Sequence, residues 1–339
     1  MLNLNSFINL PACLGTIIVI AIAIYVVLDG FDLGIGILFP FAPSDSCKDV
    51  MMNSIAPFWD GNETWLVLGG GGLFAAFPLA FSIICPAVYL PIIVMLIALV
   101  LRGVAFEFRF KAMRAKKLWD LGFHFGSLIA SFMQGMILGT IVQGIEVNNG
   151  TFAGEPYAWI SAFSVMTGFA LICGYTLLGA TWLVMKTDEI TQAWARKSAA
   201  YIILHVLLFM FIVCIWTPQL NDRIFDAWFS LPNLLYLMWI PLTTLIVAGR
   251  LIFSINTSHD REPFVLTLVL FLLGFIGLTV GTWPYIVPHT ITFAQAAAAP
   301  TSQSLIFLAL ICTLPIVLFN TGYNYYVFRG KTTRQNMYH

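Results

Sequence analysis

Charged residues are scarce in this sequence of 339 residues. They make up 9% of the chain, and the 16 basic and 16 acidic side chains cancel to a net charge of zero. A soluble globular protein carries about 25% charged residues, so this composition cannot build a water-facing surface of the usual kind. A soluble enzyme, a nucleic-acid-binding protein and a disordered chain are therefore excluded. With 60% apolar residues, the sequence predicts a polytopic membrane protein.

Cysteine and histidine are also few, which bears on metal chemistry. The six cysteines are scattered without CxxC spacing, so neither an iron–sulfur site nor a disulfide framework is indicated. Of the five histidines, only His205 lies clearly within an apolar span, whereas a haem or copper site needs one or two well-supported axial ligands. A lone helical histidine is more often a buried hydrogen-bonding group. We predict no metal-ligating and no cofactor-binding residue, with His205 as a minor candidate ligand.

Nine apolar spans, each needing about 20 residues to cross a membrane as a helix, fit between the rare charges. The interval 64–101 is too long for one straight span and is broken around residues 78–86, so it supplies most of one helix and all of the next. Prolines and Gln295 interrupt the last apolar run over 284–300, which predicts a loop. We therefore expect an all-α membrane protein. The other spans are expected within 1–28, 120–146, 155–186, 197–222, 226–250 and, on either side of that loop, 263–328.

Lysine and arginine indicate the orientation, because loops on the cytoplasmic side of a membrane carry an excess of them. With nine helices, all 16 except Arg223 fall in connections on one side. That side is predicted to be cytoplasmic, with a periplasmic N-terminus and a cytoplasmic C-terminus. Residues 11–28 are expected to be a retained first helix, since the sequence has neither a basic segment before them nor a small-residue cleavage site.

Four carboxylates stand out against this background. Asp29 and Asp32 lie near the inner end of the first helix, and Asp60 and Glu63 lie at the start of the second. The members of each pair are three residues apart and share one helix face. By the predicted topology all four lie toward the cytoplasm. Carboxyl groups in a low-dielectric site can bind protons at neutral pH, so this group can hold and pass protons.

A structural role is the alternative for each pair. Asp60 and Glu63 have the spacing of a helix N-capping box. Asp29 and Asp32 lie inside an apolar run, so for them proton handling and a structural ion pair both stay open, with Arg102 as the candidate partner.

We interpret the glycines in the first two predicted helices as positions of close helix packing. Gly30, Gly34 and Gly36 have a small-xxx-small pattern that lets helices approach closely. The four glycines at 69–72 are not a phosphate-binding loop, because no strand precedes them and no Lys or Ser follows.

Several segments resemble subunit II of cytochrome bd-type ubiquinol oxidases. Residues 29–36 (DGFDLGIG) and 53–66 (NSIAPFWDGNETWL) match the two hallmark segments of that family. Residues 102–109 (RGVAFEFR), 119–122 (WDLG) and 179–182 (GATW) are also similar. The segments 283–288 (WPYIVP) and 295–300 (QAAAAP) resemble the cyanide-insensitive branch.

The resemblance implies a bacterial inner-membrane complex that oxidises ubiquinol and reduces oxygen to water. Such an oxidase is electrogenic without pumping protons. Two haems b and one haem d are expected on the partner, subunit I, and none on this chain. A structural quinone, membrane lipid and a small single-helix accessory subunit are further expected partners, and no nucleic acid is expected. The implied fold is one membrane domain, 1–339, with four-helix bundles at 1–145 and 156–290 and a peripheral ninth helix at 304–328.

The resemblance also implies roles for the acids. Asp60 occupies the position in the WDGN segment where the family has an acid linked to a proton path from the cytoplasm. Asp29 and Asp32 fall in the nearby DGFD segment, and Glu63 is a further candidate. Arg102, Glu107 and Arg109 are expected to form ion pairs with lipid or with the other subunit.

Two other classes of function are weighed against the oxidase. A proton-coupled secondary transporter would use an intramembrane carboxylate, but that class tends to have broken helices that meet at the midplane, whereas these acids lie near one face. A purely structural scaffold for subunit I would need none of the four carboxylates.

Overall fold

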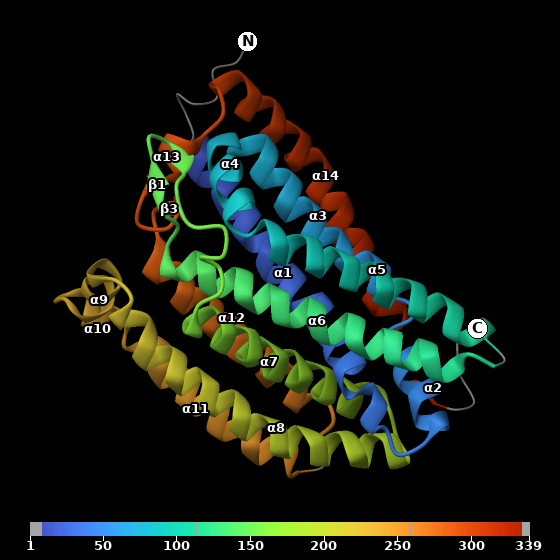
Figure 1. Ribbon diagram of the computed structural model, residues 1–339. Coiled ribbons are helices and arrows are strands. Elements are labelled where there is room, and N and C mark those ends of the chain that lie inside the picture. The colour runs from blue at the N-terminus through green and yellow to red at the C-terminus, as the bar shows by residue number, and fades with distance from the viewer. Residues whose placement is uncertain (1–8, 113, 258, 334–339) are drawn as a thin grey trace.

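The computed structural model describes residues 9–112, 114–257 and 259–333 and is almost entirely α-helical (Figure 1). The long helices are α1 (Leu10–Leu38), α3 (Trp59–Ala76), α5 (Tyr89–Lys111), α6 (Lys116–Gln143), α7 (Ala162–Lys186), α8 (Glu189–Trp216), α11 (Trp239–Ile255), α12 (Glu262–Thr282) and α14 (Pro300–Val327). Shorter helices are α2 (Asp45–Asn53), α4 (Pro78–Ala87), α9 (Asp222–Phe229), α10 (Asn233–Leu237) and α13 (Phe293–Ala296). Two small hairpins pair β1 (Val147–Asn148) with β2 (Thr151–Phe152) and β3 (Tyr285–Val287) with β4 (Ile291–Thr292).

The long helices support the prediction of a membrane protein, but the second predicted span is divided into two helices. Eight helices in the described part of the chain are long and apolar enough to cross a membrane, and α3 and α4 are not among them. α3 ends at Ala76, Phe77 leaves the helical conformation, and α4 begins at Pro78. The break is expected, because Pro78 has no N–H to donate and its ring disfavours helix at the preceding residue. The count of nine spans stays a prediction.

α1 is longer than the sequence suggested. It begins after Asn9, whose side chain accepts a hydrogen bond from the N–H of Ala12, and it runs through both acids to Leu38. A 3₁₀ turn containing Pro40 then ends the helix. Asp29 and Asp32 therefore lie inside the C-terminal part of α1, and the helix does not end before them as the predicted span 11–28 did.

α1 lies between α3, α6 and α7 (Figure 1). Its contact with α7 is made almost backbone to backbone. A Cβ atom added at Gly34 would lie 1.8 Å from the carbonyl oxygen of Tyr175, and one added at Gly179 would lie 2.5 Å from the carbonyl carbon of Gly34. At Gly36 an added Cβ would meet Ser127 of α6. The close packing predicted from the small-xxx-small pattern is confirmed.

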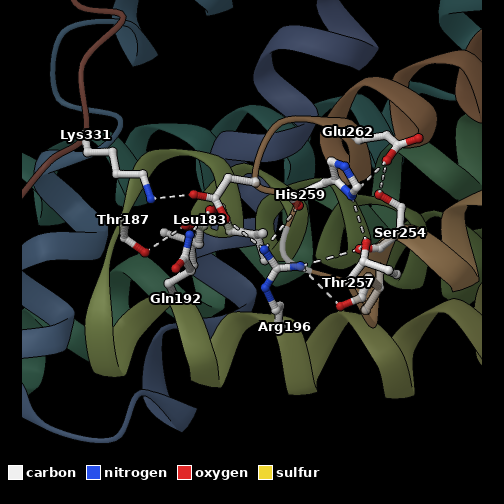
Figure 2. Close-up of polar contacts among 12 residues, drawn as sticks. Leu183, Thr187, Gln192, Arg196, Ser254, Thr257, His259, Glu262 and Lys331 are labelled. Atoms are coloured by element: carbon white, nitrogen blue, oxygen red, sulfur yellow. Dashed lines mark hydrogen bonds and ion pairs between the residues drawn. The ribbon is translucent and has the colours of Figure 1, made fainter.

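Hydrogen bonds and ion pairs close the end of the bundle that carries α2 and the α5–α6, α7–α8 and α11–α12 loops, which we call the basic end (Figure 1). Arg196 of α8 donates to the carbonyl oxygen of Ile255, the last residue of α11, and to the carbonyl oxygen of His259 and the carboxylate of Asp260 in the loop that follows (Figure 2). Lys331 donates to the same carboxylate at 2.7 Å. These bonds satisfy carbonyl groups at the end of α11 and attach the segment after α14 to the loop.

The close contact of α1 and α7 predicts that Gly34→Ala is destabilising. Because backbone stands where the new methyl group would go, the helices must move apart, and overpacking of this kind costs about 1–3 kcal/mol. We expect the melting temperature of the purified protein in detergent to fall by several degrees. Gly71→Ala is the matched control, since an added Cβ there meets nothing within 4 Å. Equal melting temperatures for the two variants would contradict the packing described above.

Asp260 predicts acid-sensitive stability at the basic end. Burial favours its neutral form, but hydrogen bonds from Lys331 and Gln192 outweigh that effect, so the pKa of this carboxyl group lies below its usual value. A depressed pKa stabilises the fold above the ordinary value of about 3.9, and the contribution is lost as the pH falls through the folded-state value. We expect Asp260→Asn to lower the melting temperature at neutral pH. The difference from the wild type should shrink as the pH falls below about 4 and vanish once the pH is below the folded-state pKa; a difference that persisted there would assign Asp260 a packing role instead.

Candidate functional site

A buried guanidinium group gathers three of the four predicted acids. Arg102 of α5 is 1% exposed, and its Nη1 lies 2.7 Å from Asp29 Oδ1 and 3.2 Å from Glu63 Oε1. Its Nη2 lies 4.0 Å from Asp32 Oδ2. Asp29 and Asp32 are fully buried, whereas the side chain of Glu63 is 28% exposed. We call Asp29, Asp32, Glu63 and Arg102 the Arg102 cluster.

The cluster is held by hydrogen bonds that involve α3 and one further helix, α14. Asn62 of α3 donates from Nδ2 to Asp32 Oδ2 at 2.7 Å and to the carbonyl oxygen of Leu28 at 3.2 Å. Its Oδ1 accepts a hydrogen bond from the hydroxyl group of Tyr325, on α14, at 3.0 Å. Asn324 of the same helix donates to the carbonyl oxygen of Pro57. The start of α3 is therefore fastened to the end of α14.

A cavity of about 230 Å³ lies where α3 and α14 meet. Amide and hydroxyl groups contribute to its wall, which is unusual on helices of such apolar composition. The sequence analysis missed this contribution of α14, although the polar run NTGYNY at 320–325 is a signal that could have pointed to it. The residues concerned are Asn62, Asn320, Thr321, Asn324 and Tyr325.

A second chain of polar groups extends from the cluster between α1, α6 and α7. The Tyr175 hydroxyl group donates to Gln134 Oε1 at 2.8 Å, and Gln134 Nε2 donates to the Tyr25 hydroxyl group at 2.7 Å. Tyr25 lies four residues before Asp29 on α1, so both face the same side of that helix.

The cluster contains more acidic than basic groups, and this excess favours proton binding. Three carboxyl groups face one guanidinium group in a site from which most water is excluded. Unpaired negative charge is costly in such a site, and a carboxyl group relieves that cost by taking up a proton. The arrangement can therefore hold a proton without moving any helix.

Asp60 stands apart from the cluster. It is exposed on the outer face of α3, and within the residues that the structure describes its carboxylate makes no hydrogen bond or ion pair. The capping alternative is wrong, because the N-cap of α3 is Phe58, without a side-chain capping bond, and Asp60 lies in the first turn. A role of Asp60 in a proton path stays a prediction. Helical residues three apart are offset by about 60° around the axis, enough for Glu63 to face Arg102 while Asp60 faces outward.

A second ion-pair network lies nearer the basic end. Arg109 is also buried, and it contacts Asp120 at 2.6 Å and Asp49 at 2.7 Å. Lys48 and Lys116 contact the same two acids. The expectation that Arg102 and Arg109 pair with lipid or with another subunit is wrong: both lie on the inner face of α5 and pair within the chain. Glu107 is exposed, and its expected partner outside the chain stays a prediction.

His124 and His205, the histidines on the long helices, each have a ring nitrogen close to a backbone carbonyl oxygen. A haem iron needs an axial ligand that faces a cofactor-sized cavity. His124 Nδ1 lies 3.2 Å from the carbonyl oxygen of Gly36, and His205, expected to be buried, is exposed with Nδ1 at 3.1 Å from the carbonyl oxygen of Tyr201. Over residues 9–112, 114–257 and 259–333, no three His, Cys, Asp or Glu side chains gather as metal ligands would. Arg334 and His339 lie outside the described residues.

Comparison with known proteins identifies the family. Residues 10–328 match the model of the family described as cytochrome bd terminal oxidase subunit II. The chain belongs to this family. It is 25% identical over 351 residues to cytochrome bd-I ubiquinol oxidase subunit 2 of Escherichia coli (strain K12), covering 92% of each chain. It is 29% identical over 324 residues to cytochrome bd ubiquinol oxidase subunit 2 of Bacillus subtilis (strain 168), covering 91% of this chain and 92% of the relative.

A solved structure agrees with the fold. A chain of the bd oxidase from Geobacillus thermodenitrificans superposes with a TM-score of 0.77 at 15% identity, covering 95% of this chain and 99% of that one. The resemblance noted from the hallmark segments is confirmed. As a bd oxidase subunit II, the chain is part of a ubiquinol oxidase, an oxidoreductase complex of a bacterial respiratory membrane. Membership of the family implies a haem-containing complex and a partner subunit I.

Arg102→Met is expected to destabilise the subunit strongly. It leaves two buried carboxyl groups without their counter-charge, and breaking a buried pair in this way costs about 3–5 kcal/mol. We expect a large fall in the melting temperature and in the yield of the assembled complex, with partial recovery when Asp29→Asn is added. Arg114→Met is the control, because Arg114 is exposed in the α5–α6 loop. If Arg102→Met has the same melting temperature as this control, the guanidinium group of Arg102 does not stabilise the cluster.

Proposed function

We propose that this chain is the subunit of a bd-type ubiquinol oxidase that ligates no haem, assembles with subunit I and helps to supply protons from the cytoplasm for the reduction of oxygen to water. The two haems b and haem d are assigned to subunit I. The observation that carries the proposal is the Arg102 cluster, a buried group of acids with one member, Glu63, at the surface of the chain. Water formation consumes protons, so a path for them has to reach the oxygen-reducing site.

The orientation belongs to the same proposal. Apart from Arg223 and Arg334, the basic residues lie at or near the basic end, so the positive-inside rule makes that end cytoplasmic and the N-terminus periplasmic. Protons for water then enter from the cytoplasm, while those released by ubiquinol leave on the other side, which makes the reaction electrogenic without a pump.

The domain organisation is proposed in the form expected from the family. α3 and α4 together take the place of the second of nine membrane helices. Residues 1–145 and 156–290 form the two four-helix bundles, and residues 304–328 form the ninth helix. A bound quinone, lipid and a single-helix accessory subunit complete the proposed partners in the bacterial inner membrane.

Two alternatives make different predictions. A proton-coupled transporter needs a site that opens to both sides, usually where helices are broken, but α1 passes unbroken through Asp29 and Asp32. A scaffold that only stabilises subunit I would tolerate the loss of every acid once the complex had formed.

The test is oxygen consumption by the intact complex with ubiquinol as the electron donor. Asp32→Asn keeps the size of the side chain but removes its charge, and we expect the rate to fall by about tenfold or more with the haem content unchanged. Asp60→Asn is expected to lower the rate less, because Asp60 lies outside the cluster. Glu155→Gln, an exposed carboxylate at the opposite end, serves as the control and should leave the rate unchanged. Full activity of Asp32→Asn and Asp60→Asn, and likewise of Asp29→Asn and Glu63→Gln, would support the scaffold instead.

A further inference from the structure

The three carboxyl groups of the Arg102 cluster are not equivalent. Asp29 is fully buried and makes the shortest contact with Arg102, at 2.7 Å. Asp32 is fully buried and accepts a hydrogen bond from Asn62 at 2.7 Å. Glu63 contacts Arg102 at 3.2 Å through Oε1, shorter than the 4.0 Å between Arg102 and Asp32, but its side chain alone among the three acids reaches the surface of the chain. One member can therefore exchange a proton with the outside, while the other two are enclosed.

Asn62 restricts what Asp32 can do. The Asn62 amide nitrogen carries only donors, and it serves two acceptors, the Leu28 carbonyl oxygen and Asp32 Oδ2. Its oxygen accepts from the Tyr325 hydroxyl group, so the amide is oriented from both sides. The hydrogen bonds run in one direction, from Tyr325 through Asn62 to Asp32, and they favour an ionised Asp32 because that carboxylate is the final acceptor.

The charged and titratable groups around Glu63 come from each helix packed near it. Asp29 and Asp32 present negative charge from α1, Asp60 from its own helix, and Arg102 presents positive charge from α5. Three tyrosine hydroxyl groups lie around the two buried acids; they belong to Tyr25, Tyr175 and Tyr325.

Resting on the proposed function, we propose that Glu63 is the group of the cluster that binds and releases the proton, and that Tyr325 is a positioning residue that acts through Asn62 to keep Asp32 a carboxylate. A proton from water or another donor outside the chain forms an O–H bond with the Glu63 carboxylate, and its release restores the carboxylate. No electron is transferred. Protonation weakens the attraction between Glu63 and Arg102, while Asp29 and Asp32 continue to balance the guanidinium group.

The experiment records pH-dependent infrared difference spectra of the intact complex in lipid vesicles, in which a protonated carboxyl group gives a carbonyl-stretch band. We expect one titrating band to disappear in Glu63→Gln and to remain in Asp32→Asn and in the control Glu155→Gln. Haem content and elution volume of each variant show that the complex has assembled. A band that remained in Glu63→Gln, or that disappeared in Asp32→Asn, would place the proton elsewhere and overturn the proposal.

Tyr325→Phe tests the positioning role. Without the Tyr325 hydroxyl group Asn62 is held from one side only, so we expect a second carbonyl band from Asp32 that is absent when Asp32→Asn is added. Tyr323→Phe is the matched control, because Tyr323 lines the same cavity with its side chain largely exposed. Identical spectra for Tyr325→Phe and the wild type would refute the role of Tyr325.

The two proposals fail in different ways. If the band disappears in Glu63→Gln while oxygen consumption stays normal in all the acid variants, the proton is located correctly but proton supply is not the function. If Asp32→Asn slows oxygen consumption while the band survives in Glu63→Gln, proton supply stands and Glu63 is not the exchanging group.

Discussion

One buried guanidinium group sets the arrangement of the first helices. Arg102 comes from α5 and meets carboxyl groups from α1 and α3, so three helices share one centre of charge. Taking such charges out of water costs several kcal/mol for each ion, and their attraction offsets this cost only when the geometry is close. Because the contacts are short, the positions of α1, α3 and α5 relative to one another are tied to this centre. Asn62 and Tyr325 extend the same constraint to α14.

Burial of this centre depends on how α1 divides its surface. Gly30 and Gly34 turn toward α7, where an added Cβ would meet Tyr175, while Asp29 and Asp32 turn toward the helices that carry Arg102 and Asn62. Glycine on one side lets the backbones approach, and the charged side chains on the other side then lie among apolar neighbours and away from lipid. The DGFDLGIG segment therefore combines a packing face and a charged face within two helical turns.

The sequence predicted the parts of the site that follow local rules. Helical periodicity placed Asp29 and Asp32 on one face, and the need of buried acids for a counter-charge pointed to Arg102. The same spacing misled for Asp60 and Glu63, because α3 begins after Phe58 without a side-chain cap. The Asp60 side chain is exposed, whereas Glu63 is partly buried. The polar run at 320–325 marked the segment that carries Tyr325, but its pairing with Asn62 was beyond reach, since 263 residues separate the two and no local pattern relates them. The division of the second helix at Phe77 was foreseeable from Pro78. The extension of α1 to Leu38 was not, because the prediction assumed that a membrane helix ends at its first charged residue.

The difference between fixed and exchangeable charge gives the proposed proton supply its physical basis. Asp29 makes the shortest contact with Arg102, and Asp32 accepts a hydrogen bond from Asn62 that favours its ionised form, so these two enclosed acids are the ones that attract a proton toward the cluster. A partly exposed carboxyl group can gain and lose that proton without leaving a buried charge unpaired, and Glu63 meets this condition. Alternating access would require helices that open on two sides, but an oxidase needs only delivery toward one consuming reaction. A rigid cluster near one end of a continuous helix suits delivery, because nothing in it has to move except the proton.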